Sequence, residues 1–167
     1  MEERPIIKLP LSKFDKGLET AGFLMVLLLW ILTAVVYSRL PGTIPTHFNF
    51  SGVPDDFGSK TTLIVFPLIG TIIFVGLTLL NRYPHIFNYT SDLNRQNAEQ
   101  RYTNATRMLR FLKLAIVVIF FMIVLFTYLT ATGKARGLGI WFLPFVFLLT
   151  LSPTVYYIVK GLRTRSS

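Results

Sequence analysis

The chain has 167 residues, of which 52% are hydrophobic, and a formal net charge of +9. It contains no cysteine, which excludes a disulfide framework, a thiolate nucleophile and a cysteine metal site. Four stretches lack Asp, Glu, Lys, Arg and His: 20–38, 61–81, 114–133 and 137–159. Such charge-free stretches exclude an ordinary soluble domain of amphipathic helices and alternating strands.

Each charge-free stretch is close to the roughly 20 residues that a helix needs to cross about 30 Å of hydrocarbon. The predicted fold class is therefore all-α integral membrane, a four-transmembrane-helix bundle in a single domain over residues 17–162. The spans are expected at about 20–38, 61–81, 112–132 and 138–159. Residues 1–16 form a basic tail before this domain, and residues 163–167 form a second tail after it.

Thirteen of the 17 Lys and Arg residues lie before the first span, between the second and third spans, or after the fourth. The other loops hold the remaining four: Arg39, Lys60, Lys134 and Arg136. The positive-inside rule therefore predicts that both termini (N-in/C-in) and the segment 82–111 are cytoplasmic, and that loop 39–60 is extracytoplasmic. Topology and attraction to anionic lipid account for the net charge, so we expect the lipid bilayer, and no nucleic acid, as a partner.

The outer loop 39–60 is polar and rich in turn residues, unlike the sequence around it. Its structural residues are prolines and glycines that favour tight turns: Pro41, Pro45, Gly52, Pro54 and Gly58. Between them, residues 46–50 alternate polar and aromatic side chains, which is the period of an extended strand. We therefore expect this loop to be ordered.

Six polar side chains of this loop are the candidate ligand-binding residues: His47, Asn49, Asp55, Asp56, Ser59 and Lys60. One histidine and two carboxylates can bind a divalent cation or act as acid and base. However, the eight-residue separation of His47 from Asp55 is not a recognised metal-ligand spacing. The carboxylates can equally hold turns through hydrogen bonds to the backbone, and Ser59 can cap the second span. We expect no catalytic residue, no metal and no cofactor.

The cytoplasmic segment 82–111 has a second motif at the exit of the second span: Pro84, His85, Phe87 and Asn88. Beyond it, apolar residues recur at spacings of three and four, which predicts an amphipathic helix that continues into the third span, with Ser91 or Asp92 as its N-cap. The apolar stripe consists of Ala98, Tyr102, Ala105, Leu109 and Leu112. It is expected to pack inside the protein, with the membrane surface or a cytoplasmic protein partner as alternatives.

No ionisable residue lies in the interior of a predicted span, which argues against proton relays, ion-coupled transport and intramembrane proteolysis. The sequence also lacks a nucleophile elbow, a phosphate-binding glycine loop and a zincin pattern. An enzyme would therefore have to work at the outer rim with very few groups.

Residues of the outer loop resemble an uncharacterised bacterial membrane-domain family that also forms the N-terminal part of SdpI-type toxin-immunity proteins. The resemblance covers roughly residues 18–90 and depends on Leu40-Pro41, Ile44-Pro45, His47-Phe48, Gly52, Pro54-Asp55, Gly58-Ser59-Lys60 and the later Pro84-His85-Phe87-Asn88. It implies a multi-pass protein of the bacterial plasma membrane with this loop outside. SdpI-type proteins continue with a further membrane region that this sequence lacks, so the transfer of the immunity role stays open.

The leading functional expectation is a non-enzymatic protein that senses or binds an exported peptide or envelope component through the outer loop, in an immunity-type role. One alternative is a metal-dependent or acid–base enzyme that uses His47, Asp55 and Asp56 at the outer rim. The other is an accessory subunit of an oligomeric transporter, in which the chain forms a homo-oligomer or joins a partner.

Overall fold

The computed structural model of the protein describes residues 4–89 and 93–163, with side chains as far as Gly161. Its four long helices are α1 (Lys13–Tyr37), α2 (Val65–Leu80), α3 (Ala98–Ala131) and α4 (Phe142–Arg163). Between α1 and α2 lie the strands β1 (Thr43–Phe48) and β2 (Pro54–Ser59) and the 3₁₀ helix η1 (Lys60–Ile64), and a second 3₁₀ helix, η2 (Pro84–Ile86), follows α2.

Four helical segments in the described residues are long and apolar enough to cross a membrane: Lys13–Tyr37, Lys60–Leu80, Ala98–Ala131 and Phe142–Gly161. Only 22% of the most apolar window is buried in each of the first three segments, and 11% in the fourth. Most of their apolar surface therefore faces outward, as expected where lipid rather than protein surrounds the helices. The prediction of four helices long and apolar enough to span a membrane is confirmed.

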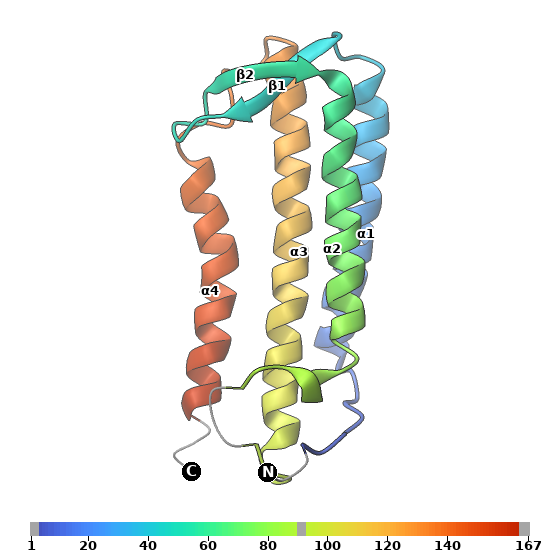
Figure 1. The fold of residues 1–167 in the computed structure, drawn as a ribbon, viewed down its shortest axis with the longest axis vertical. Helices are drawn as coiled ribbons and strands as arrows, with labels where there is room; N and C mark the ends of the chain where they lie inside the picture. The colour runs from blue at the N-terminus through green and yellow to red at the C-terminus, as the bar shows by residue number, and fades with distance from the viewer. Residues whose placement is uncertain (1–3, 90–92, 164–167) are drawn as a thin grey trace.

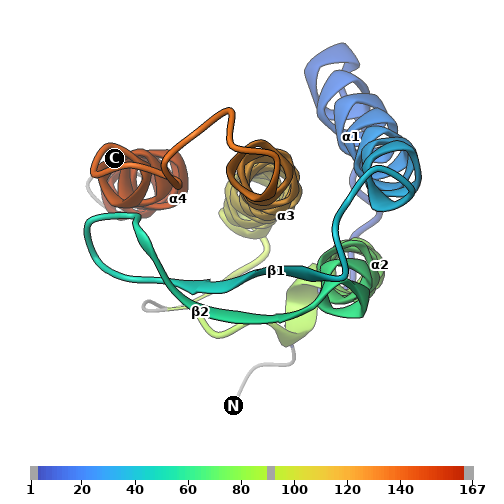
Figure 2. The same cartoon turned by 90° about the horizontal axis from the view of Figure 1, so that it is seen from above.

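Helix α3 is the centre of the arrangement, because α1, α2 and α4 all pack against it (Figure 1). Viewed from above, α4 and the α1–α2 pair lie on different sides of α3, and the β-hairpin extends across the ends of the helices (Figure 2). The two termini and η2 lie at the opposite end (Figure 1). The main core is buried between α1, α2 and α3 and includes Leu29, Val36, Leu63, Phe74, Val117 and Val124.

Close packing in this core depends on small residues. A Cβ on Gly22 would lie 2.5 Å from the Phe74 ring, and a Cβ on Gly70 would lie 3.0 Å from the Phe120 ring. Glycine therefore lets α1 and α2 each accept an aromatic ring against the backbone, as small residues commonly do between membrane helices.

Two helices begin at places that differ from the sequence predictions. Helix α1 begins at Lys13, within the predicted tail, because Ser12 and Asp15 form a capping box that satisfies the first backbone donors. Helix α3 continues from the cytoplasmic segment into the span, as predicted, and begins at Ala98 after Asn97. The proposed N-caps Ser91 and Asp92 lie outside the described residues.

The predicted apolar stripe of α3 is only partly the buried face. Ala98 and Tyr102 are fully buried, whereas the last three members of the stripe are half-buried: Ala105, Leu109 and Leu112. The most deeply buried face instead continues from Tyr102 through polar residues, namely Thr106, Arg110 and Lys113. The reason is that this face meets two carboxylates of α1, which are described below.

Candidate functional site

The outer loop forms an antiparallel β-hairpin in which Ile44 pairs with Gly58, Pro45 with Phe57 and His47 with Asp56. Irregularities on both sides of His47 interrupt this register. Ile44 is 1% exposed and belongs to the main core, so β1 is attached directly to the helices. The predicted extended segment 46–50 thus overlaps β1, while β2 was not predicted because its sequence reads as turn.

Asn49 builds the turn of the hairpin. Its side-chain oxygen accepts hydrogen bonds from the backbone N–H groups of Ser51 (2.9 Å) and Val53 (3.1 Å). Its own N–H donates to the Val53 carbonyl oxygen at 2.9 Å. This is the local bonding by which asparagine favours turns, so the side chain is already engaged.

Gly52 fastens the tip of the hairpin to the connection between α3 and α4. The Leu138 N–H donates to the Gly52 carbonyl oxygen at 2.7 Å, and a Cβ on Gly52 would collide with the backbone of Gly139. Gly52 also has a φ of +73°, which L side chains rarely adopt. Glycine is therefore needed here for both conformation and close approach.

The other predicted structural residues of the loop have more modest roles. Pro45 is buried beneath the hairpin, whereas Pro41 is exposed and Pro54 begins β2 in a half-buried position. A Cβ on Gly58 would lie 3.0 Å from the Thr46 side chain, so this position also favours a small residue.

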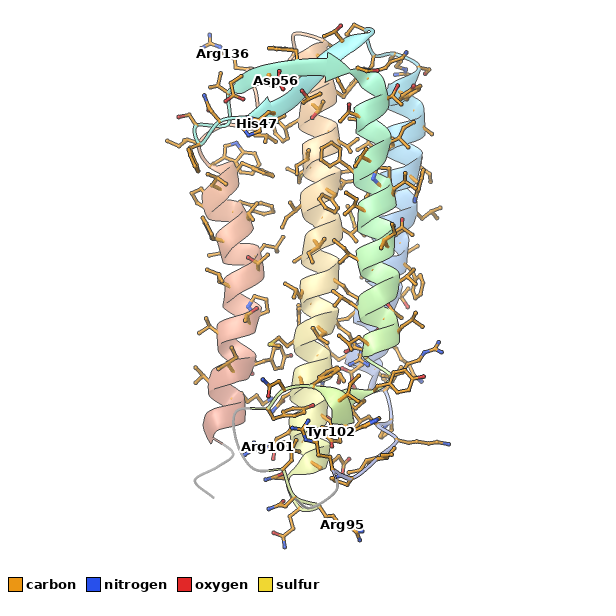
Figure 3. The ribbon with its side chains drawn as sticks, in the orientation of Figure 1. His47, Asp56, Arg95, Arg101, Tyr102 and Arg136 are labelled. Atoms are coloured by element: carbon orange, nitrogen blue, oxygen red, sulfur yellow. The ribbon has the colours of Figure 1, made fainter. Side chains whose placement is uncertain are left out.

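Of the six candidate ligand-binding residues, the structure brings two side chains together. His47 Nδ1 lies 2.5 Å from Asp55 Oδ1, and these side chains are 67% and 43% exposed. Figure 3 shows His47 on the hairpin, at the same end as Arg136. The eight-residue spacing therefore does place a histidine beside a carboxylate, because the hairpin folds back between them.

The remaining candidates bond locally. Asp56 Oδ1 accepts from the Phe57 N–H at 2.8 Å, and Ser59 caps η1 by accepting from the Thr61 N–H. Lys60 Nζ lies 3.5 Å from the Tyr37 carbonyl oxygen and 4.8 Å from the centre of the Tyr37 ring, at the end of α1. Among the described residues, no three His, Asp or Glu side chains gather in a group that could hold a metal ion.

Exposed apolar side chains accompany the His47–Asp55 pair. Phe50 at the turn is 88% exposed, Phe57 in β2 is 58% exposed and Val53 is 48% exposed. The hairpin thus presents aromatic surface together with one polar pair, on a backbone fixed by Ile44 and Gly52.

At the opposite end, the second motif holds the N-terminal segment. Arg4 Nη1 donates to the carbonyl oxygens of His85 (3.2 Å) and Phe87 (2.7 Å). The Tyr89 hydroxyl donates to the Pro84 carbonyl oxygen at 2.9 Å, and burial raises the pKa of this phenol. These contacts use the backbone of the motif. His85 and His47 lie at opposite ends of the molecule, as the sequence indicated.

A buried ionic cluster, which was not among the predicted features, joins α1 to α3. Asp15 Oδ1 accepts from Arg107 Nε at 2.7 Å, and Glu19 accepts from Arg110 Nε (2.9 Å) and Lys113 Nζ (2.5 Å). Lys113 is 0% exposed. The sequence contains the two spacings, with acids four apart and bases three apart, but their pairing depends on α1 and α3 being neighbours.

Comparisons with known proteins identify part of this architecture. A family model described as Domain of unknown function (DUF1648) matches residues 24–71, which include most of α1, the hairpin and the start of α2. An uncharacterised protein of the archaeon Archaeoglobus fulgidus is 38% identical over 87 residues, covering 47% of this chain and 48% of that protein. The chain thus spans about half the length of the curated relative that it matches. No solved structure matches the chain.

The matched segment lies within the region that carries the resemblance described above. It therefore links the hairpin to a domain that has been recognised as a unit but has no known function. The relative is archaeal, so similar sequences are not confined to bacteria.

Proposed function

We propose that this protein is a non-enzymatic binding protein of the bacterial plasma membrane, with the hairpin outside and both termini in the cytoplasm. The distribution of Lys and Arg supports this orientation. Twelve of the 17 belong to described segments at the end that carries the termini and η2, whereas the hairpin end has Arg39, Lys60, Lys134 and Arg136. Cytoplasmic ends of membrane helices carry this excess.

The hairpin is the proposed binding surface, and its ligand is an exported peptide or an envelope component. The observation that carries this proposal is a hairpin fixed at both ends, through Ile44 and Gly52, that nevertheless exposes Phe50 and Phe57. A preorganised backbone loses little entropy on binding, and exposed aromatic rings supply most of the energy in many interfaces. The His47–Asp55 pair adds a polar contact that an amphipathic peptide can satisfy.

The resemblance to SdpI-type proteins suggests that the ligand is a secreted toxin and that binding gives immunity. The test is to delete the gene and measure sensitivity to envelope-active peptides, with restoration by the wild-type chain or by variants. We expect Phe57→Ala and His47→Ala to restore less tolerance than wild type at equal membrane levels. The matched control is Ile140→Ala, which removes a 75% exposed apolar side chain at the same end but outside the hairpin.

Unchanged tolerance in Phe57→Ala, His47→Ala, Asp55→Ala and Lys60→Ala, with normal membrane levels, would contradict a binding role for the hairpin. Loss of tolerance in Ile140→Ala to the same degree would contradict the assignment of the effect to the hairpin surface.

A second candidate is acid–base catalysis at the outer rim, which the His47–Asp55 contact favours. A carboxylate beside imidazole orients the ring, as in many hydrolytic sites. This candidate predicts turnover by the purified protein that is lost in both His47→Gln and Asp55→Asn. A binding protein would instead retain part of its affinity in Asp55→Asn, because the amide oxygen still accepts a hydrogen bond.

A further inference from the structure

A cavity of about 570 Å³ opens at the end of the molecule that carries the termini, between η2, α3 and α4. This volume is within the roughly 300–1,000 Å³ typical of small-molecule sites. Most of its wall is apolar and comes from four elements: Leu80, Ile86, Phe87, Ala105, Met108, Leu109, Tyr157 and Ile158. Ile86 and Ile158 are 58% and 50% exposed, so the rim on this side is itself apolar.

The polar residues that α3 contributes to the cavity lie toward one end. Arg101 and Asn104 belong to the first two turns of α3, whereas Met108 and Leu109 are nearer the predicted span. Because a helix rises about 1.5 Å per residue, Arg101 and Leu109 are separated by about 12 Å along the helix axis. Polarity therefore decreases along the cavity in the direction of the membrane. Figure 3 shows Arg101 at the end opposite His47.

Asn104 supplies a donor that the protein leaves unused. The residue is 5% exposed, and its amide nitrogen Nδ2 is buried with no hydrogen-bond partner among the described residues. A buried amide group without a partner is costly, so a ligand with an acceptor oxygen at this point removes that cost on binding.

A second, polar hollow of about 320 Å³ adjoins the same residue. Asn104 lines both spaces, so the hollow continues the polar end of the cavity. Two cations and one acid line the hollow: Arg107, Lys160 and Glu99; a third cation, Arg101, lines the adjoining cavity. Arg107 is bonded to Asp15 of α1, so its charge is already balanced. The other charged lining residues are two cations and one acid, which favours an anionic group with acceptor oxygens next to Asn104.

We propose that this cavity binds an anionic phospholipid of the surrounding bilayer, with the phosphate at Asn104 and an acyl chain along Met108 and Leu109. The polarity gradient matches such a lipid, because its headgroup lies outside the hydrocarbon and its chains enter it. Basic pockets between membrane helices on the cytoplasmic side are a recognised arrangement for anionic headgroups. The proposal does not depend on the role of the hairpin.

The test is native mass spectrometry of the full-length, delipidated protein, titrated with phosphatidylglycerol or phosphatidylcholine of the same acyl chains. Wild type is expected to take up one saturable phosphatidylglycerol, about fivefold to tenfold more tightly than phosphatidylcholine. Asn104→Leu removes the amide and is expected to weaken phosphatidylglycerol binding about tenfold. Ala105→Trp fills the apolar part and is expected to abolish the saturable adduct.

Two variants at the other end serve as controls and should bind like wild type: Lys134→Gln for charge and Ile140→Trp for bulk. If Ala105→Trp does not fold, as judged by circular dichroism, the milder Asn104→Leu variant still decides the question. Equal binding of both lipids, or wild-type binding by Asn104→Leu, would overturn the proposal. Inorganic phosphate that binds alone as tightly as the lipid would also overturn it, because the acyl chain would then contribute nothing.

Discussion

Glu19 holds two buried cations of α3, and we predict that removing its carboxylate destabilises the fold more than removing Lys113, one of those cations. Its two oxygens accept from Arg110 Nε at 2.9 Å and from Lys113 Nζ at 2.5 Å. In Glu19→Leu, the fully buried Lys113 keeps only the Thr78 hydroxyl, at 2.7 Å, and the face of a neighbouring aromatic ring. Removing one partner of a buried ion pair costs about 3–5 kcal/mol, because the other charge stays buried and uncompensated.

Lys113→Met is the informative comparison. Methionine fills a similar volume, and Glu19 retains its bond to Arg110, so no charge is left without a partner. The expected cost is about 1.5–3 kcal/mol, the value of one hydrogen bond to a charged group. Adding Lys113→Met to Glu19→Leu should recover part of the loss, since the buried ammonium is then gone.

The assay is reversible unfolding in mixed micelles, monitored by circular dichroism, for wild type, both single variants and the double variant. Glu19→Leu is expected to be the least stable of the four. A Lys113→Met variant less stable than Glu19→Leu, or a double variant whose loss equals the sum of the single losses, would refute it.

Three further predictions follow from other contacts. Gly52→Ala is expected to cost about 1–3 kcal/mol of unfolding free energy in the same assay, because of the positive φ of Gly52 and the close approach of Gly139. Gly42→Ala should cost under about 0.5 kcal/mol, because the added Cβ would have no neighbouring atom within 4 Å. Equal losses would contradict the proposed attachment of the hairpin through Gly52. Arg4→Ala should increase the amide hydrogen exchange of residues 85–87 several-fold relative to Lys8→Ala, because the Arg4 bonds to the backbone of the motif are lost. Unchanged exchange would show that those bonds do not hold the segment. The pKa of Tyr89 is raised by burial, so the contribution of the neutral Tyr89 phenol to stability is complete below about pH 10 and is lost as the pH rises further. Tyr89→Phe should therefore lose less stability than wild type between pH 9 and about pH 11. Parallel curves of stability against pH for the two proteins would be evidence that Tyr89 is not the origin of the loss.

The four spans could be predicted from the sequence because crossing hydrocarbon requires a long run without charge, and such runs have no other common explanation. The beginning of α1 was also encoded locally, since Ser12 and Asp15 have the spacing of a capping box. That signal was obscured by Pro10 and by the lysines on both sides, which read as a tail.

The hairpin and the ionic cluster depend on contacts that sequence patterns do not specify. Strand β2 reads Pro-Asp-Asp-Phe-Gly-Ser, which favours turns, and it becomes a strand through its pairing with β1 and the tie at Gly52. The partnership of Glu19 with Lys113 required knowing that α1 and α3 are neighbours. Ala105 and Leu109 of the half-buried stripe likewise line a cavity, because residues of α4 and η2 form other parts of its wall.

Cysteine labelling tests the placement of the hairpin outside the membrane most directly, because the chain has no native cysteine. Ser51, in the exposed turn, and Gln96, exposed at the other end, are each changed to cysteine in separate variants. A membrane-impermeant maleimide is expected to label Ser51→Cys in intact cells, and Gln96→Cys only after the membrane is permeabilised. Labelling of Gln96→Cys in intact cells, with Ser51→Cys protected, would contradict the proposed orientation and the binding role of the hairpin.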